Sequence, residues 1–188
     1  MKLKWALNEL KKYQDEMLTL DGTADLEQAL KERDEEILAC EAVSIKGSVE
    51  VDKDGVYYAD LVLKTKVTLP SSRSLEPVTM PLSIPFSEIY LSPQSPVTVD
   101  SFTEGEIVEE LSSDVLDLQK SIEDAILSNK PTQVFTEEEL KSDEMPSGKD
   151  WDVVGEDTHI SQPSKKSDDD EGDPRFAALK DLFKEDDE

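Results

Sequence analysis

The sequence predicts an α+β protein: a twisted antiparallel β-sheet with flanking short helices, an acidic disordered linker and a C-terminal amphipathic helix. Three observations predict this architecture. Apolar and polar residues alternate on both sides of an Asp54-Gly55 pair, which is typical of a β-hairpin. Apolar residues at helical spacing occur before and after that region. The 188 residues carry a net charge of -25 and only 36% are hydrophobic, so part of the chain is too polar to form a core.

The chain begins with a short amphipathic stretch. Residues 4–13 place Trp5, Leu7, Leu10 and Tyr13 near helical spacing, and both a short helix and an extended lead-in strand fit this pattern. Thr23 follows as a candidate N-cap for a short helix over residues 25–31, which has acidic residues in its first turn.

The strongest local signal is the hairpin. Before the turn, Val43, Ile45, Val49 and Val51 alternate with polar residues. After the turn, the odd-numbered positions from Tyr57 to Leu69 are mostly apolar, and the even-numbered ones include charged residues. The pattern predicts two antiparallel strands with one buried face and one face in water.

A third strand is expected at residues 78–86, where the apolar residues occupy even positions. Pro77, Pro81 and Pro85 occupy odd positions in the same stretch. Residues of one parity aim their backbone N–H groups to the same side, and proline has no N–H to donate. We therefore expect an edge strand that is protected against pairing with another chain.

Two further elements complete the expected domain. Residues 108–111 are compatible with a short strand. Ser113 or Asp114 is a candidate cap for a helix that ends before Pro131, with an apolar face along one side. That face consists of Val115, Leu118, Ile122, Ala125 and Ile126. The α+β domain is expected to span residues 1–135.

The remaining residues change character. Residues 101–188 carry 9 basic and 27 acidic side chains, and residues 136–172 read as an acidic disordered linker. Residues 173–188 predict an amphipathic helix and an acidic end, with Asp173 as N-cap and Pro174 in the first turn. Its apolar stripe is Phe176, Leu179, Leu182 and Phe183. A helix this short must pack on something, either its own domain or a groove on a partner.

Signals for enzymatic chemistry are weak, and we expect no catalytic, metal-binding or cofactor-binding site. The single histidine, His159, falls in the acidic linker, and Cys40 lies in an apolar stretch typical of a buried side chain. Paired carboxylates carry no information in so acidic a chain. No stretch approaches the roughly 20 apolar residues of a membrane-spanning helix, and a cytoplasmic location is expected.

A small basic cluster is the candidate for RNA contact. Lys64 and Lys66 share the water-facing side of their strand, and Arg73 lies just beyond it. These cations could touch RNA phosphates, or they could solubilise the face and form ion pairs. The net charge of -25 opposes a broad RNA-binding surface.

Three stretches of the chain resemble the YceD/YlbN-like family, the large ribosomal RNA subunit accumulation proteins. They are Leu-Lys-Trp-Ala-Leu-Asn-Glu-Leu at residues 3–10, Leu-Pro-Ser-Ser-Arg-Ser-Leu-Glu-Pro-Val at residues 69–78, and Gly-Asp-Pro-Arg-Phe-Ala-Ala-Leu-Lys-Asp-Leu at residues 172–182. Many members have cysteines where this chain has Ser71 and Ser74. Because serine is a poor zinc ligand, hydrogen bonds and packing must hold the turn here, and an Arg73–Glu76 ion pair is one hypothesis.

The resemblance implies a non-enzymatic role in 23S ribosomal RNA accumulation and therefore in large-subunit biogenesis. The acidity of the chain favours a basic ribosomal protein or assembly factor as the direct partner of a monomer, with direct RNA binding as the alternative. The partner-binding candidates come from the central and terminal stretches: Arg73, Leu75, Glu76, Pro77, Asp173, Pro174, Arg175, Phe176 and Leu179.

Overall fold

The hairpin around Asp54-Gly55 is the centre of the sheet, as the alternation predicts. β4 (Val43–Val51) and β5 (Val56–Pro70) pair antiparallel, with Val51 opposite Tyr57 and Ser44 opposite Lys64. The Asp52 N–H donates to the Val56 carbonyl at 2.9 Å, and Gly55 has a φ of 75°. Glycine adopts that φ without steric cost, which explains why glycine occupies this position of the turn.

The computed structural model describes residues 1–141, 148, 149 and 153. Met1–Glu137 form one compact unit, and a second unit begins at Glu138. The helix α4 (Glu137–Lys141) begins at the last residue of the first unit and lies within the stretch that the sequence predicts as disordered linker. Most of that linker and the whole predicted C-terminal helix lie outside the described residues.

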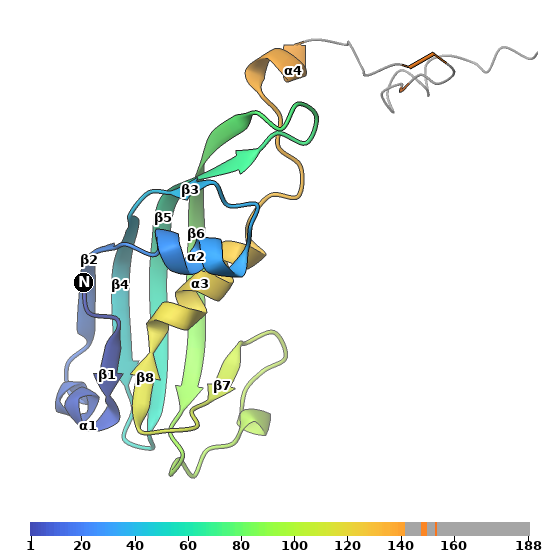
Figure 1. Ribbon diagram of the computed structural model, residues 1–188. Helices are drawn as coiled ribbons and strands as arrows, with labels where there is room; N and C mark the ends of the chain where they lie inside the picture. Colours follow the sequence, from blue (N-terminus) through green and yellow to red (C-terminus); the bar gives the residue numbers. More distant parts are fainter. Residues whose placement is uncertain (142–147, 150–152, 154–188) are drawn as a thin grey trace, which may run out of the picture. The chain divides into compact units, whose positions relative to one another are not determined.

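Six strands form the main sheet, in the order β2-β4-β5-β6-β7 with β3 beside β5 (Figure 1). The remaining four are β2 (Leu18–Ala24), β3 (Ala39–Cys40), β6 (Pro77–Leu91) and β7 (Val108–Glu110). All pairs are antiparallel except β6–β7, which is parallel, so the expectation of a purely antiparallel sheet is wrong at this edge. The chain leaves β6 through the segment that contains η2 (Val99–Ser101) and returns in the same direction.

The first strand and the last strand of the domain form a separate two-stranded sheet. β1 (Lys4–Ala6) pairs antiparallel with β8 (Val115–Asp117), and Trp5 lies opposite Leu116. α1 (Leu7–Leu10) and the short 3-10 helix η1 (Lys11–Tyr13) follow β1 directly. The two structures that the sequence leaves open for residues 4–13 are therefore both present, one after the other.

Two helices begin later than the sequence predicts. Thr23 belongs to β2 rather than capping α2 (Glu27–Arg33); the Asp25 carboxylate instead accepts the Glu27 N–H at 3.2 Å. α3 (Leu118–Ser128) is capped by Asp117, whose side chain accepts the Gln119 N–H at 3.1 Å. The predicted caps are wrong because Thr23 itself pairs within β2, and because Val115–Asp117, which follow Ser113 and Asp114, form the strand β8.

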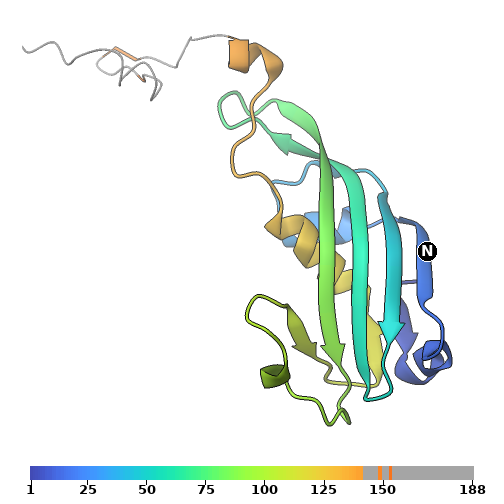
Figure 2. The same cartoon turned by 180° about the vertical axis from the view of Figure 1, so that it is seen from behind.

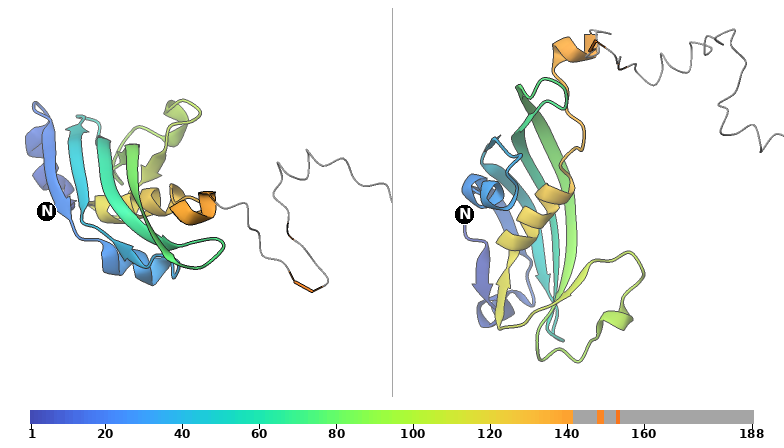
Figure 3. Two further views of the ribbon diagram at one scale, coloured as in Figure 1. Left: turned by 90° about the horizontal axis from the view of Figure 1, so that it is seen from above. Right: turned by 45° about the vertical axis from the view of Figure 1, so that its right-hand side comes forward.

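The core lies between one face of the sheet and the helices α2 and α3 (Figures 1 and 3). From the hairpin, it takes the apolar side chains that the alternation predicts, and from α3 it takes Leu118, Ile122 and Ile126, which are all at most 1% exposed. Arg33 of α2 forms ion pairs with Glu123 and Asp124 of α3 and so joins the two helices.

No helix of residues 1–137 covers the other face of the sheet (Figure 2). Near the β7 end, a small second cluster of Val56, Ile89 and Leu91 packs against side chains that include Val97 and Phe102. The even-numbered residues of β5 from Asp60 to Lys66 are exposed on this face. The polar residues that the sequence assigns to the water-facing side therefore lie there.

Glu88 is a partly buried carboxylate whose shifted pKa predicts a pH-dependent stability. Burial raises its pKa above the ordinary value of 4.5, although Tyr90, 1% exposed, donates its hydroxyl to Glu88 at 2.5 Å. The contribution of protonated Glu88 to the free energy of unfolding is fully present below pH 4.5. It is lost as the pH rises through the raised folded-state pKa, because the folded chain must then bury a charged carboxylate that the unfolded chain exposes to water.

We therefore expect Glu88→Gln to be more stable than the parent at neutral pH, with a difference that shrinks below about pH 4.5. Urea unfolding across this pH range measures it. Glu50→Gln makes the same substitution at an exposed position on the uncovered face; it is the matched control and should not stabilise the protein at neutral pH. A parent that equals Glu88→Gln at neutral pH would contradict the assignment.

Candidate functional site: the turn between β5 and β6

The turn between β5 and β6 is held by hydrogen bonds around a buried serine. Ser71 is 0% exposed, its N–H donates to the Glu76 carbonyl at 2.8 Å, and its carbonyl accepts the Leu75 N–H at 3.1 Å. Its hydroxyl accepts the N–H groups of Arg73 at 3.1 Å and Ser74 at 3.4 Å. Hydrogen bonds thus stabilise the turn, as expected for a chain with serine at this position.

The segment after α3, which includes Val134 and Phe135, anchors the same turn. The Ser72 N–H donates to the Val134 carbonyl at 2.7 Å, and the Val134 N–H donates to the Ser72 hydroxyl at 3.0 Å. The Arg73 guanidinium lies 4.9 Å from the centre of the Phe135 ring, within the range of a cation–π contact. This segment therefore restrains the turn from the side.

The hypothesised ion pair between Arg73 and Glu76 is not among the ion pairs of residues 1–141. Arg73 lies over Phe135 instead, and the Glu76 N–H donates to the Ser74 hydroxyl at 3.3 Å. Both side chains are exposed, so an ion pair there would gain little over hydration by water.

Leu75 combines an unfavourable backbone with an exposed apolar side chain. Its φ is 63°, and it is 73% exposed. A non-glycine residue in this left-handed region costs about 1–2 kcal/mol, and Leu75 recovers little of that cost by burial within its own domain. Strain without compensating packing is typical of positions that contact a ligand or partner. Leu75 is therefore the candidate contact residue at the tip of a restrained turn.

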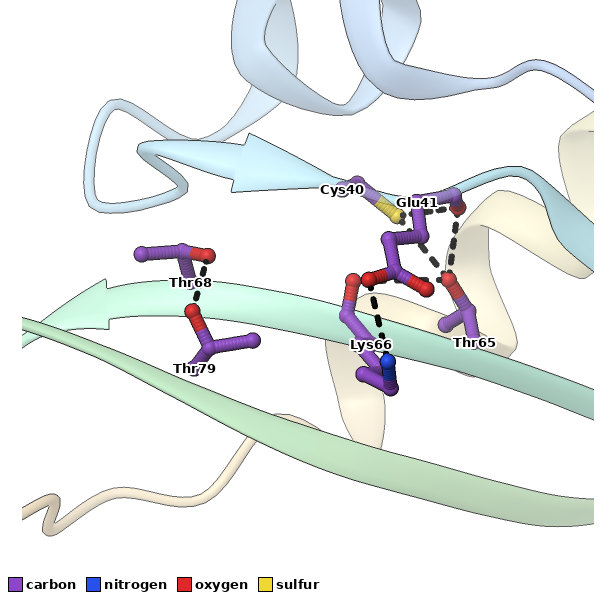
Figure 4. A network of polar contacts seen from close by, with 6 residues as sticks. All are labelled: Cys40, Glu41, Thr65, Lys66, Thr68 and Thr79. Carbon is purple, nitrogen blue, oxygen red and sulfur yellow. Dashed lines mark hydrogen bonds and ion pairs between the residues drawn. The ribbon is translucent and has the colours of Figure 1, made fainter.

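The two lysines proposed for RNA contact lie next to each other on the uncovered face, in different surroundings. Lys66 pairs with Glu41 at 3.2 Å, and Figure 4 shows this ion pair beside the Thr68–Thr79 hydrogen bond of 2.8 Å. Lys64 is exposed and has no ion pair within residues 1–141. Arg73 lies further on, in the turn. The Lys66–Glu41 pair reduces the positive potential that this cluster offers to phosphate.

Cys40 and Thr65 form the polar part of the core near Lys66 (Figure 4). The Thr65 hydroxyl donates to the Glu41 carbonyl at 2.6 Å, and Cys40 is 6% exposed. Burial raises the pKa of the Cys40 thiol, which disfavours the reactive thiolate. The prediction that Cys40 is a buried side chain is confirmed.

Several candidates lie outside the described residues: Asp173, Pro174, Arg175, Phe176, Leu179 and His159. Within the described part of the chain, no group of three or more His, Cys, Asp or Glu side chains is placed to hold a metal ion. No helix in that part is long and apolar enough to cross a membrane.

Two exposed apolar residues were not predicted from the sequence as candidate site residues. Val62 is 44% exposed and Ile107 is 60% exposed, and both line one groove beside β6. Val62 occupies an even position on a strand whose other even residues are mostly polar, and that break in the alternation was the available signal. Ile107 has no such signal, because it precedes a strand only three residues long.

The comparisons with known proteins identify the family of the chain. Residues 59–183 match the family model described as large ribosomal RNA subunit accumulation protein YceD. This match covers more than half of the chain, including the turn, and the chain belongs to the YceD family. The family resemblance inferred from the sequence is confirmed.

One curated relative extends the similarity to the whole chain. Uncharacterized protein YlbN of Bacillus subtilis (strain 168) is 29% identical over 187 residues, which is 99% of both chains. No solved structure matches the chain significantly.

Proposed function

We propose that this protein is a non-enzymatic, cytoplasmic factor of large ribosomal subunit biogenesis. In this proposal it supports 23S ribosomal RNA accumulation by binding a basic ribosomal protein or assembly factor. The observation that carries the proposal is the family match over residues 59–183, because the family is named for large ribosomal RNA subunit accumulation. Binding of a basic partner follows from the net charge of -25, which attracts cations and repels a polyphosphate backbone.

The turn between β5 and β6 supports a binding role. It presents Leu75, 73% exposed, from a backbone that Ser71 and the segment after α3 restrain. An exposed apolar side chain on a pre-organised turn loses little conformational entropy on binding. In the proposal, Leu75 contacts the partner while the acidic residues of the chain speed the encounter.

The proposal is tested with the full chain and proteins extracted from large ribosomal subunits. Immobilised protein should retain basic ribosomal proteins or assembly factors after complete RNA digestion. Depletion in cells should lower the level of 23S RNA and of mature large subunits. The proposal fails if depletion leaves large-subunit maturation unchanged, or if the purified chain binds naked 23S RNA tightly with a steep salt dependence, which indicates direct RNA binding instead.

Leu75→Asn separates binding from stability. Asparagine tolerates the left-handed region better than leucine, so the free energy of unfolding should stay equal or rise by up to about 1 kcal/mol. Retention of the basic partner should fall about tenfold, because the exposed apolar contact is lost. Leu75→Met keeps an apolar side chain and is the control that should bind like the parent. Equal binding by Leu75→Asn and the parent would exclude Leu75 as a contact.

A further inference from the structure

The outer edge of β6 is unpaired over most of its length. At its C-terminal end, the Ile89 N–H donates to the Ile107 carbonyl at 2.9 Å, and the Leu91 carbonyl accepts the Leu111 N–H at 2.9 Å. Odd-numbered residues of β6 therefore direct their backbone groups away from β5. Before Ile89, no strand of the described residues pairs with that side (Figures 1 and 2), which confirms the predicted edge.

Prolines change the chemistry of this open edge. Pro77, Pro81 and Pro85 have the outward parity and lack N–H groups, but their carbonyls remain. Thr79 and Ser83 lie between these prolines and present both a backbone N–H and a carbonyl to the open side. The edge consequently offers more hydrogen-bond acceptors than donors, and two copies of it would align proline with too few donors for a full ladder.

A groove runs beside this edge. Its volume is about 680 Å³, and it is lined by residues 84–88 of β6, neighbouring residues of β4 and β5, one side of α3, and Ile107. The exposed apolar side chains of Val62 and Ile107 belong to its lining. The groove thus combines an acceptor-rich backbone with apolar contact area.

The charged groups of the groove are mostly acidic. Its lining contains the carboxylates of Asp60, Glu88 and Asp124 and one basic residue, Lys46. The Lys46 ammonium lies 3.4 Å from the Asp21 carboxylate, and Asp124 pairs with Arg33. The charges of Lys46 and Asp124 are therefore partly balanced by residues outside the groove. Asp60 accepts only the neutral Ser87 hydroxyl, at 2.7 Å, among its hydrogen bonds to described residues. Negative charge and carbonyl oxygens together favour a cationic, donor-rich occupant.

We infer that this groove binds an extended, lysine- or arginine-bearing segment of a protein partner along the open edge of β6. The inference rests on the proposed function, whose partner is a basic protein, and it assigns the surface that this partner uses. N–H groups and cationic side chains of the segment meet the carbonyls of β6 and the carboxylates of the groove. Apolar side chains of the segment rest on Val62 and Ile107, as in other cases of peptide binding at a sheet edge.

The test uses the full chain and a fluorescent peptide of about ten alternating lysine and valine residues, long enough to follow the edge. The double variant Val62→Lys/Ile107→Lys should raise the dissociation constant at least about tenfold. The matched control, Met17→Lys/Leu38→Lys, adds the same charge at positions that are 62% and 42% exposed and do not line the groove. It should change the constant no more than about twofold.

Equal weakening by both double variants would overturn the inference, because it would show that net charge alone attracts the peptide. No binding of the peptide to the parent would overturn it too. A photo-crosslinking residue at position 107, compared with one at position 17, tests the same surface without the double variant. Crosslinking of the peptide at position 107 alone supports the inference, and equal or no crosslinking contradicts it.

The inference and the proposed function can fail separately. If the parent retains basic ribosomal proteins after RNA digestion and Val62→Lys/Ile107→Lys retains them equally well, the groove is excluded and the proposed function stands. If the parent retains none of them, the proposed function fails, whatever the peptide does.

Discussion

Replacing Gly47 with alanine is expected to lower the free energy of unfolding by about 3–5 kcal/mol. Gly47 lies in the middle of β4, opposite Leu61 of β5 and Leu20 of β2. Its φ is 150°, and an added Cβ would lie 2.1 Å from the Asp60 carbonyl oxygen and 2.8 Å from the Leu61 Cα. Both atoms belong to the backbone of a central strand, so neither can move without breaking strand pairing.

Gly105→Ala is the control for the backbone strain alone. Gly105 has a φ of 105°, but an added Cβ there meets nothing within 4 Å. We expect this variant to lose only about 1–2 kcal/mol, the cost of a left-handed residue. Urea unfolding measures both variants. If Gly47→Ala lost no more than Gly105→Ala, the close approach of β4 to β5 would be wrong.

Ser71→Ala should have the next largest effect on stability, a loss of about 1–3 kcal/mol. The hydroxyl of this fully buried residue accepts the N–H groups of Arg73 and Ser74. Alanine fits the space but leaves these donors without that acceptor. The turn should loosen because Leu75 is then no longer held in place, and on the proposed function the retention of a basic partner should fall together with stability.

Two further substitutions separate the role of the hydroxyl from that of side-chain volume. Ser71→Cys keeps a weak acceptor of larger size and should fall between the parent and Ser71→Ala. Ser74→Ala removes an exposed hydroxyl that accepts the Glu76 N–H at 3.3 Å and should lose less than Ser71→Ala. Calorimetry gives the melting temperatures. A Ser71→Ala protein as stable as the parent would show that packing alone holds the turn.

The alternation of apolar and polar residues predicted those strands of the sheet whose own sequence shows a buried and an exposed face. Val43, Ile45 and Val49 alternate with polar residues, and all three are 0% exposed. The parity of the prolines in β6 predicted which side of that strand stays open. Both inferences depend on the geometry of a single strand, in which neighbouring residues point to opposite sides.

The candidate site was only half predictable. The central stretch from Leu69 to Val78 marked the turn, and the substitution of serine for cysteine indicated hydrogen bonding. The contact of Arg73 with Phe135 was not predictable, because it arises where the segment after α3 packs on the turn. The left-handed φ of Leu75 was not predictable either, because leucine rarely adopts it. The groove was missed as well, since Val62 and Ile107 are 45 positions apart in the chain.

Local order in this protein follows from its amino-acid pattern: the hairpin, the faces of its strands and the apolar side of α3. Strand pairing between distant segments does not. Val115 was expected in a helix but belongs to β8, because β1 pairs with it across more than 100 residues. β2 went unpredicted because its pairing with β4 exists only after the chain has folded. The same holds for the close approach of β4 to β5 that requires Gly47. A short segment has little preference of its own, so the neighbour that satisfies its backbone hydrogen bonds decides its structure.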